Sequence, residues 1–266
     1  MKTISKSGKK NKKGIYILPN LFTTCSLFCG CYAIIAATQG RYDAAAVAIL
    51  ISSLLDGLDG KIARFTNTTS QFGIEYDSLA DLVAFGVAPG VLVFEWSLEP
   101  LGRFGWLAVF LFVACGALRL ARFNIQKGNR ESHHFKGLPI PGAGVFIATA
   151  VLFLNSLGDS SEHRPILFVS AMYILSFLMV STIEYLSFKG MDLFRRKPFN
   201  TLVATILVFV VVAYKPVLML FLLSSLYVLS GPAQSLYRLI HSKVRARKPL
   251  ISSSPDRGEE GLKGKS

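Results

Sequence analysis

The amino-acid sequence predicts an all-α polytopic membrane protein, a bundle of about eight transmembrane helices. Of its 266 residues, 52% are hydrophobic and 20 are Phe, and its mean hydropathy is +0.46. This composition is too apolar for an ordinary soluble domain of the same size. The charged residues are collected into short blocks between long apolar runs, which is typical of membrane helices joined by polar loops.

Eight apolar segments are candidate spans. A transmembrane helix needs roughly 20 mostly apolar residues, and somewhat fewer when neighbouring helices bury it. The last two candidates are short and are separated only by the turn sequence YKP. In chain order, the expected spans are residues 15–38, 43–62, 78–96, 104–123, 141–157, 166–188, 201–214 and 216–236.

The basic residues predict how these spans are oriented. If the amino terminus is cytoplasmic, 25 of the 29 Lys and Arg residues fall on the cytoplasmic side, in the two tails, in the segments after the second, fourth and sixth spans, or at the cytoplasmic ends of the second and fourth spans. The other side keeps Arg41, Arg103, Arg164 and Lys215. Cytoplasmic loops carry the excess of Lys and Arg, so we expect an even number of spans in the cytoplasmic membrane, with both termini inside.

The same reasoning divides the chain into three parts. We expect a basic cytoplasmic tail at residues 1–14, a transmembrane domain at 15–237, and a basic and then disordered cytoplasmic tail at 238–266. A cleaved signal peptide at 1–38 is disfavoured, because seven further spans follow and its removal would disturb the charge balance.

Carboxylates interrupt the apolar pattern between the second and third spans. Asp56 and Asp59 are three residues apart near the cytoplasmic end of the second span, and Asp77 and Asp81 are four apart at the start of the third. Each pair therefore shares a helix face, whereas Glu75 falls off both faces. Because consecutive spans run antiparallel, the four Asp side chains can meet at one depth, just inside the membrane boundary.

Four anions held this close repel one another, and burying one unpaired charge costs several kcal/mol. Oxygen ligands without His or Cys favour Mg²⁺ or Mn²⁺ over Zn²⁺, so the pattern predicts a divalent metal site. The alternative is a solvated loop whose acids merely end the helices. Gly57, Gly60, Ala63 and Gly73 lie among the acids and allow a helix or a ligand to approach closely.

The spacing Asp56-x2-Asp59-Gly60-x2-Ala63-Arg64-x8-Gly73-x3-Asp77-x3-Asp81 resembles the signature of the CDP-alcohol phosphatidyltransferases, with no position missing. Within this family the chain is most similar to the integral-membrane phosphatidylserine synthases. That similarity lies in PNLFTT (19–24), FGIEYDSLADLVAFGVAP (72–89), LRLARFN (118–124) and FKGLPIPGAG (135–144), and it covers roughly residues 15–150. The segment PGAG departs from the pattern, since it has glycines where a more alanine-rich stretch is expected.

The resemblance implies an enzyme that transfers the phosphatidyl group of CDP-diacylglycerol to an alcohol and releases CMP. It implies two divalent ions, Mg²⁺ or Mn²⁺, held by Asp56, Asp59, Asp77 and Asp81, with Asp81 also acting as the general base towards the acceptor. The residues implied to contact CDP-diacylglycerol are Asn20, Thr23, Asp56, Gly60, Ala63, Arg64 and Gly73.

The expected acceptor is L-serine, whose own carboxylate needs a cationic partner. Arg119, Arg122 and Asn124 stand at the cytoplasmic end of the fourth span, and Lys136 follows in the next loop. Arginine can grip a carboxylate through paired hydrogen bonds, although anchoring of the span by its positive residues is the alternative for both arginines. Glycerol 3-phosphate and inositol phosphate are the rival acceptors.

A cation transporter is the main rival from another class. Transporters place such acids near mid-bilayer, often on broken or repeated helices, whereas here the acids cluster at one boundary and no internal repeat is seen. The partners expected for the enzyme are CDP-diacylglycerol, L-serine, membrane lipids and a second copy of the chain in a homodimer. No nucleic acid is expected, because the basic tails are accounted for by topology and by attraction to an anionic leaflet.

Overall fold

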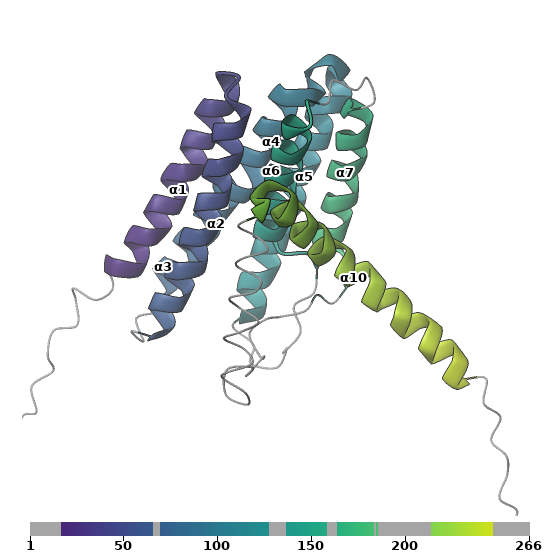
Figure 1. The fold of residues 1–266 in the computed structure, drawn as a ribbon. Helices are drawn as coiled ribbons and strands as arrows, with labels where there is room; N and C mark the ends of the chain where they lie inside the picture. The colour runs from purple at the N-terminus through teal and green to yellow at the C-terminus, as the bar shows by residue number, and fades with distance from the viewer. Residues whose placement is uncertain are drawn as a thin grey trace, which may run out of the picture.

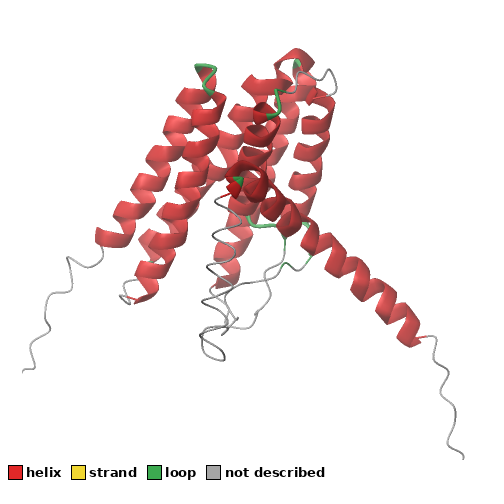
Figure 2. Ribbon diagram, in the orientation of Figure 1, coloured by secondary structure: helices red, strands yellow, loops and turns green. Residues whose placement is uncertain are grey.

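The computed structural model describes residues 17–65, 70–127, 137–158, 164–183, 185 and 214–246. The regular structure within these segments is entirely helical, without a strand (Figure 2). The elements are α1 (Ile17–Thr38), α2 (Tyr42–Phe65), α3 (Gln71–Asp81), η1 (Leu82–Val87), α4 (Ala88–Val93), η2 (Phe94–Leu98), η3 (Glu99–Leu101), α5 (Arg103–Lys127), α6 (Ile140–Ser156), α7 (Arg164–Val180) and α10 (Pro216–Ala246).

Four helical segments are long and apolar enough to cross a membrane, namely Pro19–Thr38, Gln71–Leu101, Arg103–Ile125 and Pro216–Ser235. Two shorter apolar helices, Ile140–Ser156 and Arg164–Val180, accompany them. The described part of the chain is therefore that of an all-helical membrane protein. Described helices overlap seven of the eight expected spans. The span expected at 201–214 falls outside the described residues except for its last position, so the count of eight is not confirmed.

The sixth expected span, 166–188, is wrong at its carboxyl end, because α7 ends at Val180. In a continuing α-helix the Leu178 carbonyl would accept a hydrogen bond from the amide four residues later. Here it accepts one of 3.0 Å from Leu138 instead, while Gly137 donates one of 2.8 Å to Ile183. Gly137 has a φ of +87°, a conformation that glycine adopts readily. This long-range pairing takes the place of the helical hydrogen bonds expected for residues 182 and 183.

The third span begins earlier than expected and changes its pitch along its length. Its first helix, α3, starts at Gln71 rather than at residue 78, because the Ser70 side chain caps it by accepting a 3.0 Å hydrogen bond from the Gly73 amide. The π-helix η1 begins directly after Asp81, and a second π-helix, η2, follows α4. π-Helical turns are rare in proteins, and those that do occur often lie at functional sites.

The segment η1 is packed closely from two sides. A Cβ atom at Gly30 of α1 would lie 2.8 Å from the Cα of Ala84, and one at Gly144 of α6 would lie 3.0 Å from the Cα of Phe85. Small residues let membrane helices approach to this distance. Because α1 and α6 hold η1 from both sides, the end of α3 that carries Asp81 has a fixed position.

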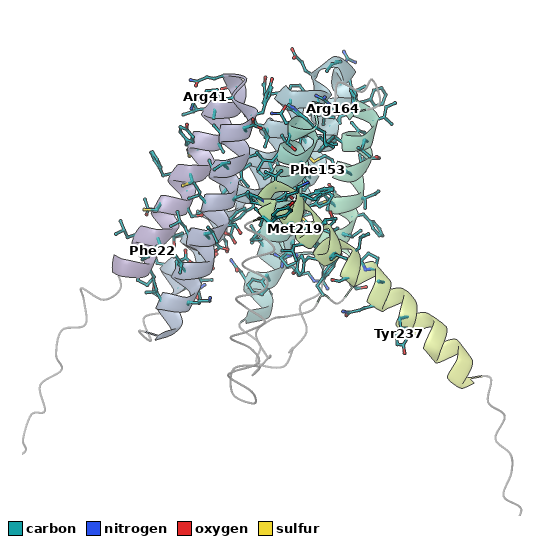
Figure 3. All side chains as sticks on the ribbon, in the orientation of Figure 1. Phe22, Arg41, Phe153, Arg164, Met219 and Tyr237 are labelled. Atoms are coloured by element: carbon teal, nitrogen blue, oxygen red, sulfur yellow. The ribbon has the colours of Figure 1, made fainter. Side chains whose placement is uncertain are left out.

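The two ends of the bundle carry different residues. In Figure 1 the start of α1, the whole of α3 and the far end of α10 lie towards one end. Figure 3 places Arg41 and Arg164 near the opposite end. These are two of the four basic residues that the charge count assigns to the side away from the acids, and they are remote from α3. Which end faces the cytoplasm stays a prediction.

Candidate active site

Three of the predicted metal ligands converge where α2 and α3 lie together. Asp56 and Asp59 come from the last turns of α2, and Asp77 comes from α3. One carboxylate oxygen of each residue lies within 4.8 Å of the others, although Asp56 and Asp77 are 21 positions apart in the chain. The Asp59 side chain is only 5% exposed. Such a set of hard oxygen ligands suits Mg²⁺ or Mn²⁺.

Helix α1 supports this cluster. The buried Thr23 hydroxyl donates a hydrogen bond of 2.8 Å to Oδ2 of Asp59. Nearer the start of α1, the Oδ1 atom of Asn20 would lie 3.3 Å from a Cβ atom at Gly73, so Asn20 sits directly against the first turn of α3. Thr23 and Asn20 are the two α1 residues that the resemblance implies. Thr23 lies beside Asp59 and Asn20 lies beside Gly73.

Asp81 lies one helical turn after Asp77 and connects the cluster to α5. Its carboxylate is close enough to Asp56, Asp59 and Asp77 to be repelled by their charges, and close enough to Arg119 to be attracted. The three acids that lie within 4.8 Å of one another do not include Asp81. Asp81 therefore lies near both the acidic cluster and the guanidinium, outside the closest group of three carboxylates.

Arg119 is a buried cation. Its side chain is 9% exposed, and its Nε atom has no hydrogen-bond partner among the residues that the structure describes. The guanidinium carbon lies 6.0 Å from the centroid of the Phe123 ring, in cation–π geometry. A buried donor without a partner costs about 1–3 kcal/mol, so this N–H group is well suited to bind an anionic ligand.

Asn124 is held in a different environment from Arg119. Its Nδ2 atom donates hydrogen bonds of 3.0 Å to Glu75 and of 3.0 Å to Ser78, and Gln71 donates one of 2.7 Å to the same Glu75 side chain. The two bonds from Asn124 join α5 to α3. The structure therefore brings Glu75, which sequence reasoning left unassigned, into contact with Asn124, and it gives Asn124 a role in holding the two helices together.

The other predicted residues are less fully defined. Gly60 and Arg122 are half-buried on α2 and α5. The backbones of Ala63 and Arg64 belong to the last turn of α2, but their side chains lie outside what the structure describes. Lys136 also lies outside the described residues.

Sequence reasoning missed Tyr227. This residue belongs to α10, which was recognised only by its hydrophobicity, and it interacts electrostatically with Arg119. No spacing or motif connects residues 119 and 227, so only the packing of α10 brings them near each other.

Comparison with known proteins gives a family for this arrangement. The family model described as CDP-alcohol phosphatidyltransferase matches residues 16–183, a segment that contains all four aspartates and Arg119. It ends before α10 begins.

Several curated proteins are similar in sequence. The CDP-diacylglycerol–serine O-phosphatidyltransferase of Helicobacter pylori (strain 26695) is 39% identical over 226 residues, which is 85% of this chain and 94% of the relative. The protein of the same name from Bacillus subtilis is 36% identical over 172 residues, or 65% of this chain and 91% of the relative. The archaetidylserine synthase of Methanothermobacter thermautotrophicus is 36% identical over 182 residues, or 65% of this chain and 71% of the relative.

Proposed function

The chain belongs to the CDP-alcohol phosphatidyltransferase family, and we propose that it transfers the phosphatidyl group of CDP-diacylglycerol to the hydroxyl of L-serine, releasing CMP. The observation that carries this proposal is the cluster of Asp56, Asp59 and Asp77, whose carboxylate oxygens lie within 4.8 Å of one another, with Asp81 close both to this cluster and to the buried cation Arg119. The acidic cluster near Asp81 suits the metal-bound diphosphate of one substrate, and the nearby Arg119 suits the carboxylate of the amino acid.

The acidic side of the site suits a metal-bound diphosphate. Asp56, Asp59, Asp77 and Asp81 would hold two Mg²⁺ or Mn²⁺ ions, since the donor set is all oxygen and its charge needs compensation. When bound, the ions would neutralise the diphosphate of CDP-diacylglycerol and hold it in place. The Thr23 hydroxyl fixes one oxygen of Asp59, so the ligand geometry is held from α1.

The donor substrate would lie along α1, α2 and the start of α3. Asn20 lies directly against Gly73, and we expect the lack of a side chain at Gly60 to leave room for the nucleotide. Its acyl chains would remain in the bilayer. The residues that we propose to contact CDP-diacylglycerol are Asn20, Thr23, Asp56, Gly60, Ala63, Arg64 and Gly73.

The acceptor would lie between Asp81 and Arg119. Serine's hydroxyl is a weak nucleophile, and a carboxylate within hydrogen-bond reach can take its proton as the new bond forms. The serine oxygen attacks the phosphorus of the phosphatidyl group, the bond from that phosphorus to the oxygen of CMP breaks, and the proton passes to Asp81. Arg119 would bind the serine carboxylate, assisted by Arg122 and Lys136, whereas Asn124 would act mainly by holding α5 against α3.

The proposed setting follows from the charge distribution. The catalytic domain would span residues 15–237 in the cytoplasmic membrane, with both tails and the acidic cluster on the cytoplasmic side. Membrane lipids would surround it, and a second copy of the chain would complete a homodimer.

One experiment tests the proposed reaction. Purified protein is given CDP-diacylglycerol, Mg²⁺ or Mn²⁺, and one alcohol at a time from a panel of L-serine, glycerol 3-phosphate and inositol phosphate. We expect CMP release and a phosphatidyl product only with serine, and neither after chelation of the metal. Release driven by glycerol 3-phosphate and indifferent to serine would contradict the acceptor but not the family. A protein that releases no CMP with any alcohol would contradict the enzymatic proposal itself.

A further inference from the structure

Helix α10 lies beyond the residues that the family model matches, and it is fastened to the rest of the protein along one face. The Ser224 hydroxyl of α10 shares a hydrogen bond of 2.8 Å with the Thr149 hydroxyl of α6, and both side chains are buried. Hydrogen bonds of this kind join helices within membranes. Three residues further along α10, the Tyr227 ring packs on Gly142 of α6, where a Cβ atom would lie 2.8 Å from Cε1 of the ring.

The next two positions on this face, Val228 and Gly231, meet Tyr185. They come four and seven residues after Ser224, and this spacing keeps them on the same side of the helix. Tyr185 is 5% exposed, and its hydroxyl donates a hydrogen bond of 3.3 Å to the Val228 carbonyl. A Cβ atom at Gly231 would overlap the Tyr185 ring, so only glycine lets the phenol reach this carbonyl.

Pro232 explains why the Val228 carbonyl needs a donor from outside the helix. In an α-helix each carbonyl accepts a hydrogen bond from the amide four residues later, so the helical donor to Val228 would be the amide of residue 232. Pro232 lies inside α10, and proline has no N–H group. Membrane helices tolerate proline where neighbouring groups satisfy the freed backbone atoms. The Tyr185 hydroxyl is such a group, since it donates to the carbonyl that has lost its helical donor.

Beyond Pro232, α10 leaves the bundle. Its last turns, residues 233–246, extend away from the other labelled helices (Figure 1), and we call them the arm. Tyr237 in the arm is 66% exposed. Because helices bend most readily at proline, the direction of the arm depends on what holds α10 at Pro232.

Tyr185 is itself held in place from α6. Gly137, just before α6, donates a hydrogen bond of 2.8 Å to the carbonyl of Ile183, two residues before Tyr185. The phenol therefore reaches α10 from a segment that is paired with the start of another helix.

We propose that Tyr185 is a latch at the proline of α10, which replaces the missing amide and holds the arm in line with the preceding part of the helix. Release of the phenol turns Pro232 into a hinge about which the arm moves. The direction of the arm is then set by the segment that follows α7, and not by α10 alone. This inference is independent of the reaction proposed above.

The test is amide hydrogen exchange in the full-length protein carrying Tyr185→Phe, which keeps the ring and removes the hydroxyl. We expect the amides of the arm to exchange roughly tenfold faster, the factor that corresponds to one hydrogen bond, while the amides of α1 exchange at an unchanged rate. Tyr173→Phe is the matched control, because Tyr173 lies on α7 with 39% of its surface exposed. It should leave the exchange of the arm unchanged.

A second variant, Pro232→Ala, restores an amide in reach of the Val228 carbonyl. This amide should be protected from exchange. In the Pro232→Ala background, Tyr185→Phe should speed the exchange of the arm by less than about twofold, because the carbonyl has regained its helical donor. If Tyr185→Phe leaves the exchange of the arm unchanged in the native background, or speeds it equally in both backgrounds, the latch is overturned. Faster exchange that extends equally to α1 reports a general loosening of the protein and overturns the latch as well.

Discussion

Thr23 in α1 donates a hydrogen bond of 2.8 Å to Oδ2 of Asp59 in α2, and both side chains are buried. The bond crosses between the first two helices, which also share the Ser26–Ser52 hydroxyl pair at 2.7 Å. The same Asp59 side chain contributes a carboxylate oxygen to the cluster with Asp56 and Asp77. The first helix therefore helps to set the geometry of a carboxylate cluster that it does not itself contain.

This relationship predicts a graded effect at position 23. Thr23→Val keeps the shape of the side chain but removes the donor, and hydrogen bonds to charged groups contribute about 1.5–3 kcal/mol. We expect the Mn²⁺ concentration needed for half-maximal CMP release to rise by roughly tenfold or more. Thr23→Ser keeps the hydroxyl and should restore a nearly normal requirement. Equal requirements in the two variants would contradict a role for this bond.

The three clustered carboxylates are predicted to be individually essential. In Asp56→Asn, Asp59→Asn and Asp77→Asn the charge is lost and the shape is kept, so CMP release should fall more than about 100-fold. The protein should stay folded by thermal unfolding in detergent, because each change relieves repulsion. Asp43→Asn is the control, since Asp43 lies at the other end of α2 and bonds to Asn155. Near-normal activity of any of the three variants at low metal would refute the shared site.

Asp81 is predicted to act differently from its neighbours. Asp81→Asn cannot accept a proton from the acceptor, although an amide oxygen can still ligate weakly. We expect transfer to serine to be lost while binding of CDP-diacylglycerol, measured by titration in the presence of Mn²⁺, is retained within about tenfold. Loss of binding to the same extent as in Asp77→Asn would assign Asp81 to metal ligation alone.

The orientation of the bundle is open to a labelling test. Single cysteines at Thr68, Gln126, Lys197 and Ser253, placed in a cysteine-free background, should react with an impermeant reagent only from the cytoplasmic side. Arg41 and Arg164, near the opposite end in Figure 3, give the complementary positions and should be labelled from outside when replaced by cysteine. Labelling of position 68 from outside intact cells would place the acids on the wrong side.

The packing around η1 predicts a loss of stability rather than of chemistry. Gly30→Val would bring its new Cβ atom to within 2.8 Å of the Ala84 backbone, and relieving such overpacking typically costs about 1–3 kcal/mol. We expect a Tm lower by several degrees. Gly57→Ala is the comparison, because a Cβ atom there meets nothing within 4 Å, and its Tm should stay the same or rise slightly. Equal Tm values for the two variants would contradict the close approach of α1 to η1.

The sequence alone predicted the membrane class, the helical fold and the meeting of Asp56, Asp59 and Asp77. These features depend on local rules, because apolar length predicts a span and residues three or four apart share a helix face. Consecutive spans also run antiparallel, and this places the end of the second span beside the start of the third. The early start of α3 was also encoded locally, in the Ser70 cap, but hydropathy concealed it, since residues 71–77 are largely polar.

Only the tertiary structure decided where α7 ends, which carboxylate Thr23 supports, and which helix α10 packs against. Each depends on segments distant in the chain, namely Gly137 against Ile183, Thr23 against Asp59, and Ser224 of α10 against Thr149 of α6. Hydropathy describes how each helix meets lipid, and it carries no information about which face of one helix contacts which face of another. That choice depends on small residues such as Gly142, which leave space for a particular ring, and on hydroxyl pairs that form only between correctly rotated helices.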